Sequence, residues 1–129
     1  MNEERTAHDE LATAIEPSSR LADDALYRAL ASTQRRRALA ILCEETELTV
    51  EALATLLTGW DATETNTMAT PADRETTLIE LVHTHLPVLA ESELVSYDAE
   101  EATVTIEPLS QPVIELIAKS VDAERQSSS

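Results

Sequence analysis

The sequence predicts a mainly α-helical domain with one small β-hairpin, arranged as a winged helix-turn-helix. Apolar residues recur at the helical period along most of the chain, and the period changes to two only between residues 94 and 107. The predicted order is three helices, a loop, a long helix, a hairpin and a last helix. So small a sheet can bury its apolar face only against helices, which favours a winged helix. In that arrangement the third helix and the long helix form the helix-turn-helix, and the hairpin is the wing.

The chain has 129 residues, which is enough for one domain with a real core. Residues 1–19 are polar and carry only a short helical pattern, so we expect a flexible acidic arm there. The compact domain is expected over 20–124. The Ser-rich end, 125–129, is expected to be a disordered tail because it is too polar to pack.

Capping residues mark the starts of the first two helices. Asp23 or Asp24 can cap a helix that runs to about Ala31, and Ser32 or Thr33 can cap a second helix. The second helix turns its apolar side chains inward, namely Leu39, Leu42 and Cys43.

The third helix is expected to begin after the capping residue Thr49 and to end at Gly59. Its apolar residues fall on one face: Val50, Leu53, Ala54 and Leu57. Residues 60–72 have neither period, are rich in Thr and contain Pro71, so we expect a loop or an insertion there.

The long helix is expected to begin near Asp73, where the helical pattern is strongest. One stripe carries its apolar face: Leu78, Leu81, Val82, His85, Leu86 and Leu89. Pro87 removes one backbone donor, so the helix should kink or divide into two pieces near His85.

The strands of the hairpin are expected at 94–98 and 103–107, and the last helix at 111–123. That helix is apolar over a broad face: Val113, Ile114, Leu116, Ile117 and Val121. One contact with the domain should not cover so much of its circumference, so we expect these residues to form the interface of a homodimer.

The chain is strongly acidic, with 25 Asp and Glu against 9 Lys and Arg and a formal net charge of -16. This excludes the usual basic nucleic-acid-binding protein and a polybasic membrane binder. Lys119 is the single lysine, and such a composition is typical of halophiles. At molar salt the Debye length is about 3 Å, so the carboxylates no longer repel one another strongly. The acidity therefore favours adaptation to a salt-rich solvent over a function as a mimic of nucleic acid.

Two stretches resemble a known family. The sequence LYRALASTQRRRALAIL (26–42) is similar to the opening helices of small bacterial and archaeal transcriptional regulators of the arsenic-repressor type. The sequence HLPVLAESELVSYD (85–98) resembles their junction between recognition helix and wing. With its acidic composition, the chain most resembles the winged-helix-like domains of unknown function of haloarchaea, over about residues 23–107. The resemblance implies a winged-helix fold and DNA-linked regulation.

The chain departs from that family at two points. Glu93 stands where Gly usually precedes the apolar pair that opens the wing, so we expect a differently built turn. The Cys-x-Cys pair and the His/Asp set of the family's metal sensors are missing.

The face of the long helix about 180° from the apolar stripe holds the candidate base-reading residues. They are Thr76, Glu80, His83 and Thr84, with Thr77 on the flank. Thr and His can contact base edges or phosphates, whereas Glu80 repels phosphates unless a cation or a cytosine amine intervenes. The alternative is a plain solvated face.

The residues Arg35, Arg36 and Arg37 form the one basic cluster and are candidates for phosphate contacts. We favour the alternative that they pair with Glu44, Glu45 or the acidic arm, because so many carboxylates compete for few cations. The acidic pair at the wing tip, 100–101, argues against a wing that grips phosphate.

Other chemistry is not indicated. His83 and His85 lie nearly opposite on a helix and cannot chelate one ion there, so we expect no metal and no cofactor. Cys43 fits a core residue better than a redox sensor. No nucleophile–base or carboxylate pair is spaced for catalysis, and no stretch is apolar enough to span a membrane, so we expect a soluble cytoplasmic protein that is not an enzyme.

The sequence thus predicts a transcriptional regulator that binds duplex DNA at high salt, as a homodimer, through the long helix. The alternative is an interaction or dimerisation module that keeps the winged-helix fold and does not bind DNA.

Overall fold

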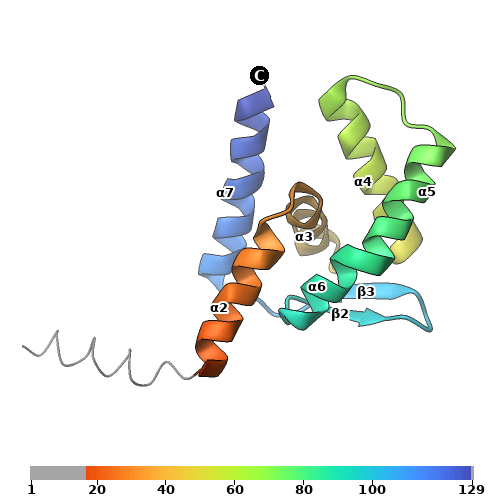
Figure 1. Ribbon diagram of the computed structural model, residues 1–129. Coiled ribbons are helices and arrows are strands. Elements are labelled where there is room, and N and C mark those ends of the chain that lie inside the picture. Colours follow the sequence, from red (N-terminus) through yellow and green to blue (C-terminus); the bar gives the residue numbers. More distant parts are fainter. Residues whose placement is uncertain (1–16, 129) are drawn as a thin grey trace, which may run out of the picture.

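Helices make up most of the structure, and a small sheet lies at one end of them (Figure 1). The computed structural model describes residues 17–128. Its helical elements are α2 (Pro17–Leu30), α3 (Thr33–Glu45), α4 (Val50–Thr65), α5 (Pro71–Glu80), the π-helical turn η1 (Leu81–His85), α6 (Leu86–Glu91) and α7 (Gln111–Ser128). The strands are β1 (Glu47–Thr49), β2 (Val95–Asp98) and β3 (Thr103–Ile106). A mainly helical fold with a small antiparallel sheet and a C-terminal helix is therefore confirmed.

Side-chain oxygens begin three of the helices as the sequence favours. Ser32 accepts a hydrogen bond from the backbone of α3, and Thr49 accepts one from Ala52 at the start of α4. Thr70 and Asp73 form a reciprocal capping box at the start of α5, with both bonds 3.1 Å long. The predicted caps at Ser32 and Thr49 are confirmed.

The prediction that the third helix ends at Gly59 is wrong, because α4 continues to Thr65. Thr63 and Thr65 donate their hydroxyls to backbone carbonyls one turn earlier, and the Trp60 ring packs on Arg37 of α3. Asn66 then ends α4 in the left-handed conformation, with φ 55°. The expected loop over 60–72 therefore shrinks to 66–70.

The long helix is divided near His85, as its proline predicts. Pro87 has no N–H to donate and its ring would press on the carbonyl one turn earlier. The chain responds with the wider turn η1, in which the backbone N–H of Leu86 bonds to the carbonyl of Leu81. The helices α5 and α6 thus continue one another with a π-helical break between them.

The sheet has the antiparallel order β1-β3-β2, so the hairpin is joined by a third strand that the sequence did not predict. Val104 in the central strand pairs with Leu48 of β1 and with Tyr97 of β2. Val95 and Val104 are buried, so the hairpin covers the core with its apolar face as expected. At the tip, the Asp98 carboxylate accepts two backbone hydrogen bonds of 3.0 Å.

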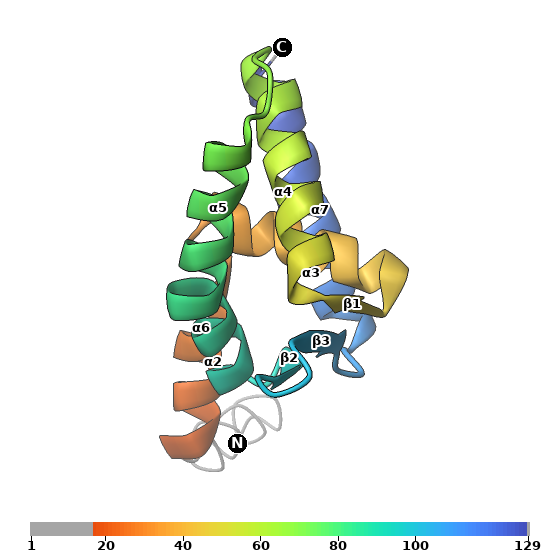
Figure 2. The same cartoon turned by 90° about the vertical axis from the view of Figure 1, so that its right-hand side faces the viewer.

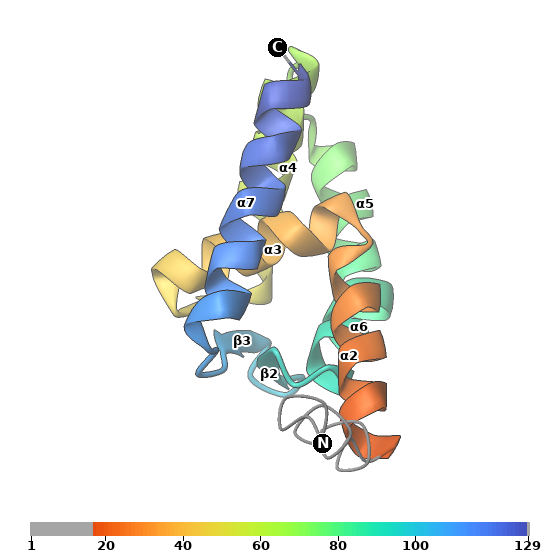
Figure 3. The same ribbon diagram turned by 90° about the vertical axis from the view of Figure 1, so that its left-hand side faces the viewer.

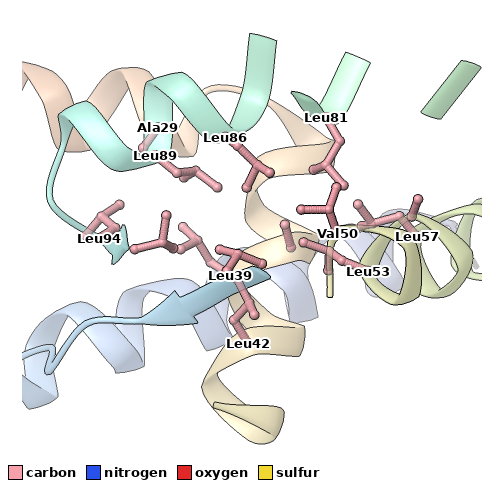
Figure 4. Close-up of a cluster of buried hydrophobic side chains, with 14 of the residues drawn as sticks. Ala29, Leu39, Leu42, Val50, Leu53, Leu57, Leu81, Leu86, Leu89 and Leu94 are labelled. Atoms are coloured by element: carbon pink, nitrogen blue, oxygen red, sulfur yellow. The ribbon is translucent and has the colours of Figure 1, made fainter. Parts of the chain in front are cut away.

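The core lies where the helices and the sheet meet (Figure 4). The predicted stripe of the long helix supplies three fully buried side chains, Leu81, Leu86 and Leu89. The helices α3 and α4 and the sheet complete this core with Leu39, Leu42, Val50, Leu53, Leu57, Leu94 and Val104. Burial of these side chains holds η1 and α6 against the rest of the domain.

The turn after α6 contains Glu93, at which we expected a differently built turn. Glu93 itself takes the left-handed conformation, with φ 62°, that glycine adopts at least cost. The next backbone N–H, of Leu94, bonds back to Leu89 and closes the helix end. Glu93 thus occupies a backbone conformation that glycine would adopt at a lower cost.

The last helix crosses α3 and packs against it (Figure 3), and it extends further than predicted. It continues through residues 125–128, which the sequence suggested as a tail, and α2 begins at Pro17, inside the suggested arm. Residues 1–16 lie outside the described part of the chain. No described helix is both long and apolar enough to cross a lipid bilayer.

Candidate functional site

The outward side of α5 and η1 carries the predicted base-reading residues. Four of them are exposed, Thr76, Glu80, His83 and Thr84, and Thr77 is half-buried. Figure 2 shows this helical segment beside α4, with the strands at its far end. Ile79 is also exposed here, at 51%, and was not among the predicted residues.

The structure divides these residues between two environments. Thr76, Thr77 and Glu80 line a polar cleft of about 430 Å³ with residues of α3 and α4, whereas His83 and Thr84 lie outside that cleft. The cleft also holds the carboxylates of Asp61 and Asp73, which disfavour an anion there. Only part of the predicted face is thus an open, convex surface.

The first arginine of the basic cluster holds the end of α2. Arg35 donates to the backbone carbonyls of Arg28 and Ala29, at 2.7 Å and 3.1 Å. Carbonyls in the last turn of a helix lack partners within the helix, and a cation there also suits the helix dipole. The guanidinium of Arg35 is therefore an internal cap.

The next two arginines bind one carboxylate of α7. Arg36 and Arg37 each lie 3.1 Å from an oxygen of Glu124, whose side chain is 16% exposed. Arg36 also donates to the carbonyl of Leu30, at 2.8 Å. Arg37 is only 7% exposed and lies 3.6 Å from the carboxylate of Asp61.

These contacts give the arginine cluster ion-pair partners that differ from the expected ones. We favoured pairing with Glu44, Glu45 or the acidic arm, and among the described residues the structure pairs the cluster with Glu124 and Asp61. Residues 1–16 of the arm lie outside the described part of the chain, so pairing with them stays a prediction. Phosphate contact by these arginines stays a prediction, but their guanidinium groups are already engaged inside the domain. Glu124 gave no signal in the sequence, because one carboxylate among so many carries no pattern.

His85 joins the cluster to the break in the long helix. Its Nδ1 lies 3.3 Å from Nη1 of Arg35. Arginine can only donate, so Nδ1 accepts and the ring proton sits on Nε2. Burial lowers the pKa of His85, Arg35 lowers it further, and Glu80 acts in the opposite direction. Neutral His85 is therefore the form that fits the fold.

Two other candidate chemistries find little support in the described residues. Burial raises the pKa of the half-buried Cys43, and Glu44 adds to this, so the thiol keeps its proton. Within residues 17–128, no group of three or more His, Cys, Asp or Glu side chains is placed to hold a metal ion.

A protein-family model described as "Domain of unknown function (DUF7344)" matches residues 27–105, which is more than half of the chain. The chain belongs to this family. Neither a curated protein nor a solved structure matches it. The DUF7344 match runs from α2 to β3, so it includes the arginine cluster and the outward face of α5 and ends before α7. Glu124, which pairs with the cluster, thus lies outside the DUF7344 region.

The predicted dimer face on α7 is divided by the fold of this DUF7344 protein. Ile117 and Val121 are buried against its own domain, at 1% and 4% exposure. Val113 and Ile114 are half-buried, and Leu116 remains 44% exposed. Dimerisation stays a prediction, and within this set it now depends mainly on Leu116 and its half-buried neighbours.

Proposed function

We propose that this protein is a DNA-binding transcriptional regulator of winged-helix type that works at high salt. The observation that carries the proposal is the order α3-β1-α4-α5-β2-β3 with the sheet order β1-β3-β2. This order supports a helix-turn-helix formed by α4 and the helix that runs from α5 to α6, with the hairpin as the wing.

The surface chemistry of η1 and α5 supports contact with base edges. Thr76, His83 and Thr84 are exposed and carry small donors and acceptors that suit the major groove. Glu80 can accept a hydrogen bond from a cytosine amine, although it repels phosphates. Specificity would therefore come from direct readout by a few side chains.

The contacts of the arginine cluster within the domain affect how DNA binding should depend on salt. Ordinary DNA-binding proteins gain affinity when their cations release counterions, and that gain falls as salt rises. The cations of Arg35, Arg36 and Arg37 are occupied by carbonyls and carboxylates of the same chain. Base contacts, shape and water would then supply the affinity, so binding should be flat or rising with KCl.

The test is a binding screen of genomic DNA fragments at about 1 M KCl, followed by affinity measurements on the selected duplex. Thr76→Ala and His83→Ala should each cost about 1–3 kcal/mol of binding free energy per lost base contact. Thr63→Ala, an exposed threonine of α4, is the matched control and should bind as tightly as the wild type. Unchanged affinity in Thr76→Ala and His83→Ala, or a screen that selects no fragment, would overturn the proposal.

A homodimer would present two such helices to successive half-sites. Leu116, exposed on α7, favours this arrangement because a large apolar side chain gains from burial. Light scattering in molar KCl should give the mass of a dimer, and Leu116→Asp should give the mass of a monomer. If the Thr76 and His83 variants leave DNA binding unchanged while Leu116→Asp abolishes a protein partner, the chain is an interaction module.

A further inference from the structure

A second candidate surface is a groove between three helices. Its volume is about 480 Å³, and it is lined by residues of α3, α4 and α7 and by none of α5. Figure 1 shows α3 between α7 and α4, which form the two sides. The groove is therefore separate from the proposed DNA-binding face, although Ile114 of the predicted dimer face also lines it.

The inside of this groove is apolar. Ile41 of α3 and the buried Ile117 of α7 line it, and so does Leu56 of α4, which is 44% exposed. The ring of Trp60 lines the same side as Leu56 and is held by the guanidinium of Arg37, 5.3 Å from the ring centre. Covering a side chain such as Leu56 would release apolar surface from water.

The rim of the groove is acidic. Glu44 and Glu45 at the end of α3 and Asp122 of α7 are exposed, and no Lys or Arg is among the described residues that line the groove. An occupant with apolar side chains facing inward and cations on its flanks would match both features. An amphipathic helix presents its side chains in that way, with apolar anchors about three, four and seven residues apart.

Two other occupants fit less well. A two-fold dimer whose axis passed through the groove would bring one concave surface against another, and neither would fill the other. The chain's own N-terminal segment, 1–16, carries five carboxylates against Arg5 alone, so the acidic rim would repel it. We propose that this groove binds a basic amphipathic helix of a partner protein.

The chain provides its own probe, because Trp60 is the single tryptophan and lines the groove. A synthetic helix of about 14 residues, with Leu on one face and Lys elsewhere, is titrated against the full chain at a salt concentration at which the protein is folded. Two further peptides serve as controls: one of the same composition in scrambled order, and one with Glu in place of Lys. Trp60 fluorescence should report binding of the first peptide at least about 10-fold tighter than of either control.

Matched variants locate the binding. Leu56→Ser should weaken the first peptide by at least about 10-fold, because one apolar anchor contact is worth about that much. Met68→Ser is the control, since Met68 is exposed in the loop after α4 and does not line the groove. Circular dichroism of each variant checks that its helices are intact.

Charge reversal separates a specific rim from general attraction to an acidic protein. The double variant Glu44→Lys/Glu45→Lys should weaken binding more than Glu100→Lys/Glu101→Lys at the hairpin tip, although both change the net charge equally, because only contacts at close range escape screening by salt. Equal weakening by the two double variants, equal binding of the scrambled peptide, or unchanged binding by Leu56→Ser would overturn the proposal. So would a dimer, seen by light scattering, that Leu56→Ser converts to monomer, because a second copy would then be the occupant.

Discussion

The start of α3 and the outward face of α5 use their polar side chains in opposite ways. At the start of α3, three consecutive arginines turn their guanidinium groups toward carbonyls of α2 and the carboxylate of Glu124. On α5 and η1, Thr76, His83 and Thr84 are exposed. A basic cluster in an acidic chain is thus a poor guide to a ligand-binding surface, because its own carboxylates and helix ends bind the cations first. Four predictions test this contrast.

The largest expected effect is the loss of the carboxylate that both arginines share. Glu124→Gln leaves Arg36 without its carboxylate partner and Arg37 with the exposed Asp61 alone, so the free energy of unfolding should fall by about 3 kcal/mol. Glu115→Gln makes the same change at an exposed position of α7 and should cost less than about 0.5 kcal/mol. Urea unfolding at constant KCl measures both, and equal values would mean that α7 is not held by this pair.

A smaller loss is expected when the end of α2 loses its cap. Arg35→Gln removes the donors to Arg28 and Ala29, which should cost about 1–2 kcal/mol of unfolding free energy. Arg28→Gln removes only an exposed ion pair with Glu91, 3.7 Å long, and should cost less than about 0.5 kcal/mol. If Arg35→Gln weakened DNA binding in the folded protein without lowering its stability, the internal role of Arg35 would be wrong.

A pH-dependent effect should follow from His85, which faces Arg35 on one side and Glu80 on the other. Its pKa is lower in the folded chain than in the unfolded chain, so folding favours the neutral ring. The contribution of neutral His85 to the free energy of unfolding is complete above about pH 6.5, the pKa of histidine in the unfolded chain. This contribution is lost as the pH falls from that value toward the lower pKa of the folded chain. Thermal unfolding should therefore show a shallower decline between about pH 7 and about pH 5 for His85→Gln than for the wild type. His83→Gln, two residues away and exposed, should keep the wild-type decline.

The smallest effect on stability is expected on the outward face itself. Thr76→Ala and His83→Ala should each change the unfolding free energy by less than about 0.5 kcal/mol, because these side chains are exposed and their loss opens no cavity. A loss of more than about 1 kcal/mol in either variant would show that the face is structural, and its effect on DNA affinity would then not report base contacts.

Local chemistry made several elements predictable. Ser32 and Thr49 can satisfy free backbone donors wherever they stand before a helical pattern, and both cap helices in the structure. Pro87 divides the long helix because it lacks a donor, which is a property of the residue itself. The apolar stripe with Leu81 and Leu89 faces the core because its spacing leaves one apolar face to bury.

Contacts between distant residues decided the rest. Strand β1 forms because Glu47–Thr49 pairs with β3, and three residues alone show no strand pattern. The helix α4 continues past Gly59, and directly after that glycine the ring of Trp60 packs on Arg37 of α3. In strand β1, three residues are too few to show a strand pattern. In α4, no neighbouring residue signals that the helix continues past a glycine, which favours the end of a helix.

By itself the sequence determined where helices and the hairpin occur, since caps, periodicity and proline act over a few neighbouring residues. Only the tertiary structure decided which side chains remain available for a partner. Arg37 binds Glu124, which lies 87 residues further along the chain. That ion pair connects α3 to α7, so the guanidinium of Arg37 is engaged within the domain. The groove beside Leu56 likewise exists only because α7 packs against α3. Such choices depend on which surfaces the fold brings together, and no short stretch of sequence contains that information.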